Sequence, residues 1–305
     1  SPMEGQYPVS GGPAKGSDIP PVSYLKWYIP RLKEMREHNL SFSGLQFPWE
    51  LGTFEDIWKE HRGPGVEDRQ MVSDMYNIPV ENIHLTHGAT QALGIAIASA
   101  SRGGKVAVEM PSYGPQSQTA RILGLETITV RRLPTDKEWI IDRESWEEVL
   151  SQVDLITICP QLNPVGWTYT DDDRKWLIDA CQRHDVRIIS DEVYSGADRN
   201  WKPFFKEGDN CISISSLTKV HGLGQIRYGW MIASTDIIAN AENTFHNMAG
   251  VMSTPVIMVA NRVKPRLHEP IDLIDHYREK NLPVLQECLN RLGIEWNPPP
   301  YLSLI

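Results

Sequence analysis

Ser215-Ser216-Leu217-Thr218-Lys219-Val220-His221-Gly222-Leu223-Gly224-Gln225-Ile226-Arg227 is the stretch from which this sequence of 305 residues can best be interpreted. It follows Cys211-Ile212-Ser213-Ile214, whose alternation of apolar and small polar residues predicts a buried strand. The strand would therefore end in two hydroxyls and a lysine, followed by glycines that allow tight backbone bends. Arg227 lies eight residues beyond Lys219.

Lys219 and Arg227 have a joint chemical interpretation. A lysine beyond a strand end, among hydroxyls and turns, can be partly desolvated and so made nucleophilic. An arginine nearby is a natural partner for a phosphate group. Together they indicate a lysine that forms a Schiff base beside a phosphate clamp, as a pyridoxal phosphate enzyme requires. Most lysines after strands are solvated surface groups, so the rest of the chain has to support this interpretation.

Composition argues against several classes of protein. The net charge of −9 and the pI near 5.5 do not fit a nucleic-acid-binding surface. No apolar run reaches the roughly 18 residues that span a bilayer, and the first residues lack the pattern of a signal peptide. The four cysteines are widely spaced without a metal or redox pattern. We therefore expect buried reduced thiols, no metal site and a cytoplasmic protein.

Short apolar runs recur along the chain and predict strands at 83–86, 105–109, 127–130, 155–159, 186–190, 211–215 and 229–233. Helical segments lie between most of them, which predicts a parallel sheet with helices on both faces. Polar signatures follow the strand ends, where open α/β sheets bind ligands. From about Asn261 the pattern predicts a long helix that leads into a second domain.

Two of these strand ends have a specific chemical interpretation. Gly88-Ala89-Thr90 lies between a strand and an apolar helix, where free amides and the helix dipole can bind an anion. An ordinary capped helix is the alternative. Tyr113 lies in a turn between two prolines and could stack on a flat cofactor ring or pack on the surface.

Five motifs together, in order and spacing, resemble the class I and II aminotransferases, which are pyridoxal-phosphate-dependent enzymes of fold type I related to aspartate aminotransferase. They are Gly88-Ala89-Thr90, Pro111-Ser112-Tyr113, Asn163-Pro164-Val165-Gly166, Asp191-Glu192-Val193-Tyr194, and Ser216-Leu217-Thr218-Lys219 with Arg227. The resemblance runs from about Asn39 to the last residue. It implies a three-layer αβα large domain with a mostly parallel central sheet, and a smaller α/β domain that is incomplete in this sequence. The expected boundaries are an arm at 1–21, a segment of the small domain at 22–48, the large cofactor-binding domain at 49–260, and the long helix with the start of the small domain at 261–305.

The resemblance implies catalytic roles for three residues. Lys219 would hold the cofactor as a Schiff base, then move the substrate's α-proton as general base and acid. Asp191 would pair with the pyridine nitrogen and keep it protonated, so that the ring accepts electrons. Tyr194 would hydrogen-bond the ring's phenolic oxygen together with Asn163.

It also implies further contacts. Tyr113 would stack on the ring. The phosphate would be held by backbone amides, hydroxyls and one guanidinium, contributed by Gly88, Ala89, Thr90, Ser216, Thr218 and Arg227. Gly44 and Asn163 would lie near the substrate, with the Gly44 backbone close to its carboxylate.

The sequence departs from the family at two places. Relatives continue beyond a proline-rich point similar to Pro298-Pro299-Pro300 and there supply the arginine that grips the α-carboxylate, which no residue here matches. Either the chain is truncated or the protein is shorter than its relatives. A tyrosine that often reaches the partner subunit's phosphate is also missing from Glu60-His61-Arg62-Gly63-Pro64, where Arg62 could substitute electrostatically.

The predicted function is an aminotransferase that moves an amino group between an amino acid and a 2-oxo acid, acting as a homodimer without nucleic-acid or membrane partners. Two alternatives remain open at this point. One is a C–S (β) lyase of the same fold, which shares the cofactor residues. The other is a catalytically weak protein that binds pyridoxal phosphate, an idea that the missing carboxylate arginine motivates.

Overall fold

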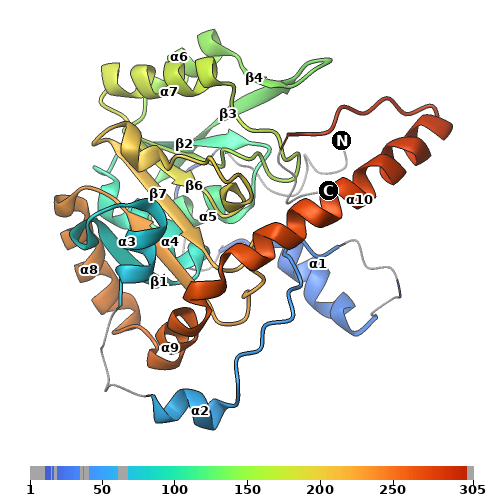
Figure 1. Ribbon diagram of the computed structural model, residues 1–305. Coiled ribbons are helices and arrows are strands. Elements are labelled where there is room, and N and C mark those ends of the chain that lie inside the picture. The colour runs from blue at the N-terminus through green and yellow to red at the C-terminus, as the bar shows by residue number, and fades with distance from the viewer. Residues whose placement is uncertain are drawn as a thin grey trace.

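The computed structural model describes residues 11–14, 16, 19–34, 37, 41–60 and 68–300. A central sheet lies between two layers of helices (Figure 1). The described helices are α1 Ser23–Arg31, α2 Phe54–Lys59, α3 Gln70–Tyr76, α4 Ala89–Ala100, α5 Pro115–Ile122, α6 Arg143–Leu150, α7 Asp171–Arg183, α8 Thr235–Ala249, α9 Thr254–Val263 and α10 His268–Arg291. The strands are β1 Ile83–His87, β2 Lys105–Met110, β3 Glu126–Pro134, β4 Trp139–Ile141, β5 Leu155–Ile158, β6 Arg187–Asp191, β7 Cys211–Ser216 and β8 Tyr228–Ile232.

The sheet has the strand order β1-β8-β7-β6-β5-β2-β3-β4. The four neighbouring pairs from β7 to β3 are parallel, whereas β8 runs antiparallel to both β1 and β7, and β4 antiparallel to β3. The predicted αβα fold with a mostly parallel sheet is therefore confirmed. Because β8 alone among the central strands is reversed, its first residue lies at the edge where β1, β7 and β6 end. That edge carries the candidate site.

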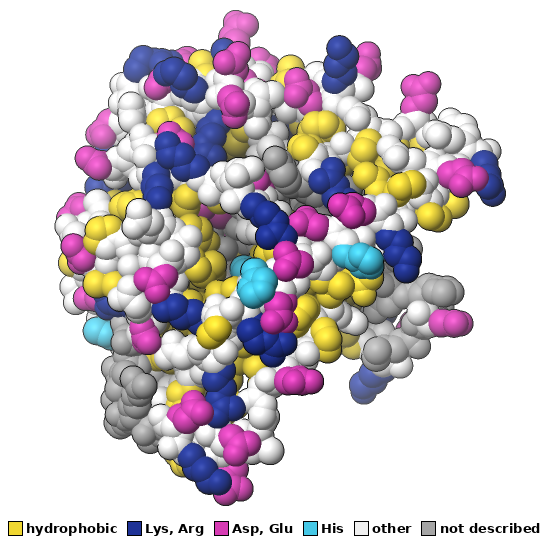
Figure 2. Space-filling model, in the orientation of Figure 1, with side chains coloured by type: hydrophobic (Ala, Val, Ile, Leu, Met, Phe, Trp, Pro, Cys, Tyr) yellow, Lys and Arg dark blue, Asp and Glu magenta, His cyan; other side chains and the backbone are white. Residues whose placement is uncertain are grey.

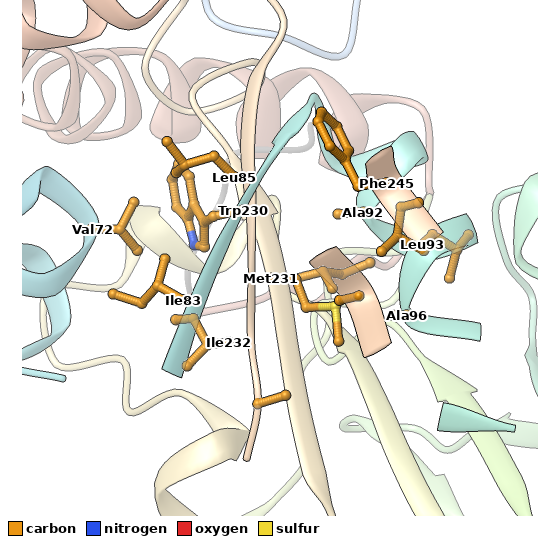
Figure 3. Close-up of a cluster of buried hydrophobic side chains, with 14 of the residues drawn as sticks. Val72, Ile83, Leu85, Ala92, Leu93, Ala96, Trp230, Met231, Ile232 and Phe245 are labelled. Atoms are coloured by element: carbon orange, nitrogen blue, oxygen red, sulfur yellow. The ribbon is translucent and has the colours of Figure 1, made fainter. Parts of the chain in front are cut away.

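Two hydrophobic cores form on opposite faces of the sheet. One includes α4, α8 and α9, and the other includes α6 and α7. Along β2, Val106 and Val108 belong to the first core and Ala107 to the second, because successive side chains point to opposite faces. Figure 3 shows the same alternation along β8, where the first core reaches both faces: Trp230 and Ile232 lie on one side with Val72, while Met231 lies on the other with Leu93 and Phe245. Strand β5 is buried along its whole length, as its unbroken apolar sequence predicts.

The C-terminal helices differ from the prediction in one respect. The long helix expected from about Asn261 begins at His268, and Thr254–Val263 forms the separate helix α9. Pro265 lies in the short 3₁₀ turn between them, where its missing amide and its ring prevent one continuous helix. Helix α10 starts against the body and then extends away from the sheet (Figure 1).

The surface is polar with scattered apolar side chains. Figure 2 shows acidic and basic groups interspersed over one face. Three cysteines are buried, but Cys288 is exposed on α10, so the prediction that all four are buried is wrong for this one. Within the described ranges, no helix combines the length and apolar character needed to cross a bilayer.

Candidate active site

The carboxyl ends of β1, β6 and β7 bring the predicted residues to one edge of the sheet. Gly88 follows β1, Asp191 ends β6, and Ser216 ends β7. Arg227 comes directly before the reversed strand β8, so it reaches the same edge from the opposite chain direction. A parallel sheet with one reversed strand thus gathers segments that are more than 100 residues apart in the sequence.

Lys219 is half-buried, and two polar side chains, those of Ser43 and Tyr194, lie beside its amine. Its Nζ donates a hydrogen bond of 2.7 Å to Oγ of Ser43 and lies 5.8 Å from the centre of the Tyr194 ring. Burial lowers the pKa of Lys219; Asp191 opposes this shift, and Arg227 adds to it. A lysine with a lowered pKa has more of the neutral, nucleophilic amine at neutral pH.

Asp191 is buried at the end of β6. Nε2 of Gln116 donates to its Oδ2 at 2.8 Å, and the Val193 amide donates to Oδ1 at 3.4 Å. Burial raises the pKa of Asp191 to about 7, against the lowering effect of these hydrogen bonds and of Lys219. Asp191 and Lys219 each favour the charged form of the other.

The turn after β1 forms a narrow cradle with Arg227. Gly88 has a φ of +83°, and a Cβ built on it would come within 2.4 Å of Nη2 of Arg227. A Cβ on Gly229 would come within 2.5 Å of the Gly88 carbonyl carbon. Glycine is therefore required at both positions, because the end of β1, the first residues of β8 and the Arg227 guanidinium approach one another closely. Helix α4 begins at Ala89, so its free amides point toward this cradle.

The three predicted hydroxyl donors differ in burial and in hydrogen bonding. Ser216 is buried and its Oγ accepts from the Thr218 amide at 3.3 Å. Thr218 Oγ1 is buried without a hydrogen-bond partner among the described residues. Thr90 is exposed in the first turn of α4. This arrangement fits a bound anion such as a phosphate. A buried hydroxyl is left without a partner, and a methyl group added at Gly88 would fill the cradle.

The remaining predicted residues lie at or near the same edge of the sheet. Tyr194 is buried, and burial raises its pKa. Tyr113 and Asn163 are half-buried in the turns that follow β2 and β5. Gly44 lies against Lys219, because a Cβ on it would be 3.5 Å from the Thr218 carbonyl oxygen. No predicted position that the structure describes lies away from this edge, whereas Arg62 falls in 61–67, outside the described residues.

Sequence reasoning missed a buried ion pair beneath the site. Glu109 and Arg132 lie on β2 and β3, with Arg132 Nε 3.1 Å from Glu109 Oε2 and both side chains at most 1% exposed. Arg132 Nη2 donates to the carbonyl oxygens of Cys159 and Pro160 at 3.1 and 2.8 Å. Tyr169 donates a hydrogen bond to Glu109. A signal was available for Glu109, which ends an apolar run, but not for Arg132, which follows Arg131 beyond the predicted strand 127–130.

Gln116 and Ser43 were missed as well. Gln116 follows Tyr113 by three residues at the start of α5, and Ser43 directly precedes Gly44. Their positions beside predicted site residues were a signal. Only the folded chain shows that their side chains point toward Asp191 and Lys219.

Comparison with known proteins agrees with the fold. Aspartate aminotransferase from Thermus thermophilus superimposes with a TM-score of 0.79 at 15% identity, covering 92% of this chain and 80% of that structure. A PLP-dependent aminotransferase from Streptococcus suis gives a TM-score of 0.78 at 22% identity over 90% of this chain and 78% of its own. The PLP-bound C–S lyase of Staphylococcus hominis gives 0.68 at 18% identity over 77% and 65%. The architecture is that of the fold type I PLP-dependent enzymes.

The family follows from the sequence comparison. The description "Aminotransferase class I and II" matches residues 69–266, and the chain belongs to this family. Histidinol-phosphate aminotransferase of Blochmanniella pennsylvanica is 26% identical over 78% of this chain and 67% of its own length. S-alkyl-thiohydroximate lyase SUR1 of Arabidopsis thaliana is 30% identical over 56% and 38%. The chain spans between 37% and 67% of the first curated relatives that it matches.

Proposed function

We propose that this chain binds pyridoxal phosphate through Lys219 and acts as an aminotransferase between an amino acid and a 2-oxo acid. The observation that carries this proposal is that a partly desolvated amine, Lys219, and a buried carboxylate, Asp191, lie at the ends of the adjacent parallel strands β7 and β6. Membership of the class I and II aminotransferase family supports it.

Each residue has a proposed role that its side-chain chemistry supports. Pyridoxal phosphate supplies an aldehyde that an amine can capture and a ring that withdraws electrons from a substrate's α-carbon. Lys219 would hold that aldehyde and later carry the α-proton. Asp191 would keep the pyridine nitrogen protonated by its negative charge. Tyr113 would stack on the ring, and Asn163 and Tyr194 would hydrogen-bond its phenolic oxygen.

The phosphate would occupy the cradle beside Arg227. The donors would be the backbone amides of Gly88 and Ala89 and nearby hydroxyls, which are those of Thr90, Ser216 and Thr218. Thr218 has the strongest structural case, since its buried Oγ1 has no partner among the described residues. Gly44 and Asn163 would contact the substrate. Arg227 gives the charge-assisted bond that orients the group.

We further propose a homodimer located in the cytoplasm, with a large cofactor-binding domain over 49–260. A small domain would combine 22–48 with the region from 261 onward, because α10 leaves the body of the sheet (Figure 1).

A C–S lyase is the second candidate function, favoured by the similarity to SUR1 and to the Staphylococcus hominis enzyme. Single-turnover spectra separate the two. For a transaminase, an amino donor alone converts the bound cofactor to pyridoxamine phosphate and releases only the 2-oxo acid. A lyase instead breaks the C–S bond of a cysteine conjugate, releases the thiol together with pyruvate and ammonia, and leaves the cofactor as the aldehyde.

The covalent attachment can be tested directly. The protein is incubated with pyridoxal phosphate, reduced with borohydride, and digested for peptide mass spectrometry. We expect the tag on Lys219, and its loss in Lys219→Ala with unchanged circular dichroism. Lys175→Ala, which removes an exposed lysine on α7, is the control and should keep the tag. A tag on another lysine would overturn the assignment.

A further inference from the structure

The segment from Ser43 to Leu45, which precedes α2, runs along the backbone of Thr218 and Lys219. The Leu45 amide donates to the Lys219 carbonyl oxygen at 2.8 Å. Gly44 packs against Thr218, with 3.5 Å between a Cβ built on it and the Thr218 carbonyl oxygen. These contacts join parts of the chain about 175 residues apart and fix where the side chain of Ser43 points.

The Ser43 hydroxyl lies between two groups of the candidate active site. It accepts a hydrogen bond from Lys219 Nζ at 2.7 Å. Ser43 also lowers the pKa of Tyr194, against the larger raising effect of burial, so its hydroxyl lies close to the phenol. A hydroxyl has one proton to donate and lone pairs to accept. Because the lysine amine donates to the Ser43 oxygen, the hydroxyl proton is left free to be donated to the Tyr194 oxygen.

The other groups that face Lys219 act at longer range. Asp191 favours the ammonium form, Arg227 opposes it, and the Tyr194 ring lies 5.8 Å away. Among the hydrogen bonds of the described residues, the one to Ser43 is the direct bond of this amine. Neighbouring charges can shift the balance between amine and ammonium, but they do not fix the direction of the N–H bonds.

We propose that Ser43 is a positioning residue for Lys219, whose hydroxyl bridges the lysine amine to the Tyr194 phenol and sets both the place and the protonation of the free amine. The inference rests on the proposed role of Lys219, because the amine matters chemically only if it captures an aldehyde and carries a proton. Ser43 itself forms no covalent bond.

The test measures the reactivity of Lys219 in cofactor-free protein. Potassium cyanate carbamylates neutral amines, so the rate at Lys219, followed by peptide mass spectrometry across a pH series, reports the protonation midpoint. Ser43→Ala removes an acceptor of the ammonium and should lower the midpoint by about one pH unit, since bonds to charged groups are worth about that much. Ser43→Thr keeps the hydroxyl and should restore the wild-type midpoint.

Ser151→Ala is the matched control. Among the described contacts, the Ser151 hydroxyl bonds only the Glu148 carbonyl, at the exposed C-terminal end of α6. It should titrate like wild type. If Ser43→Ala does not fold, Ser43→Cys keeps the size with a much weaker acceptor and should show the same downward shift. An unchanged midpoint in the folded variant, or a Ser43→Thr midpoint equal to that of Ser43→Ala, would overturn the proposal.

The two proposals fail in different ways. If borohydride reduction leaves Lys219 of the wild type untagged by pyridoxal phosphate, the proposed function fails, whatever the cyanate titration shows. If Lys219 is tagged in both proteins while their cyanate midpoints coincide, only the role of Ser43 fails.

Discussion

Gly88 is the backbone position on which the anion cradle depends most. Gly88→Ala adds a Cβ at a φ of +83° and 2.4 Å from Arg227 Nη2, so the guanidinium must move out of the cradle. We expect the affinity for pyridoxal phosphate to fall about tenfold or more, the value of one charge-assisted bond. Fluorescence titration with the cofactor measures this.

Gly103→Ala is a matched control for that substitution. Gly103 has a φ of +85°, but no atom lies within 4 Å of a Cβ built there. Both variants should lose about 1 kcal/mol of unfolding free energy to backbone strain. Equal losses of cofactor affinity in the two variants would show that strain, and not the contact with Arg227, is responsible.

Asp191 makes the stability of the cofactor-free protein depend on pH. Its pKa is raised from 3.8 to about 7 by burial, so between these values the folded state holds a proton that the unfolded state has released. The free energy of unfolding must therefore fall as pH rises, by about 2 kcal/mol from pH 5 to pH 7 for this one group. Urea denaturation at several pH values measures the slope.

Asp191→Asn isolates that contribution. The variant cannot titrate at this position, so its slope should be flatter than that of wild type by the same amount. Burial shifts the pKa values of Glu109 and His221 without a contribution from Asp191, so these two groups titrate alike in both proteins and cancel in the difference. Identical slopes would mean that Asp191 stays ionised in the folded protein.

At this scale, the sequence predicted residues that belong to a motif and missed residues that do not. A lysine after a strand is most often a solvated surface group, so Lys219 and Asp191 could be proposed only because five motifs agree in order and spacing with one family. A serine or a glutamine fits many surroundings. The contacts of Ser43 with Lys219 and of Gln116 with Asp191 depend on pairings about 175 and 75 residues apart.

Strands β2 and β3 are joined to the turn after β5 by the ion pair of Glu109 and Arg132. Arg132→Met keeps the volume but leaves Glu109 buried and unpaired, and it removes two bonds to the carbonyls of Cys159 and Pro160. We expect a loss of about 3–5 kcal/mol of unfolding free energy. Denaturant unfolding measures this.

The double variant Arg132→Met/Glu109→Gln tests whether the unpaired charge causes that loss. It should recover at least about 1 kcal/mol relative to Arg132→Met, because no buried carboxylate is left without a partner. A double variant no more stable than Arg132→Met would mean that the lost bonds to the carbonyls, and not the unpaired charge, cause the loss.

Among the elements, long apolar runs were predictable and short irregular pieces were not. The seven expected strands are present, and six of them agree with their predicted ends to within one residue, whereas β3 continues to Pro134, four residues beyond the predicted end. Strand β4, Trp139–Ile141, was missed because three residues contain too little alternation to show a period. The reversal of β8 was also missed, since strand direction follows from connections and pairing, which composition does not encode.

Helix α10 joins the body of the molecule through its first turns. Ile271 and Ile274 are buried against Ala197 and Val220, whereas Val284, further along the helix, is 60% exposed. Ile271→Ala should therefore lower the unfolding free energy by about 3 kcal/mol. Val284→Ala on the same helix should change it by less than about 0.5 kcal/mol. Thermal unfolding of the two variants compares them, and equal effects would contradict this attachment.

The pairing of β7 with β8 limits how the molecule can vary. Ser216 is held opposite Gly229, and Leu217 donates to the Tyr228 carbonyl, so both ends of the connection carrying Lys219 and Arg227 are fixed. One residue added or removed there would shift the amine relative to the guanidinium, or else break the ladder. The turn between β3 and β4 at this edge also joins paired strands, but it carries no candidate site residue. We expect natural variants of this chain to keep the spacing between Lys219 and Arg227 to the residue.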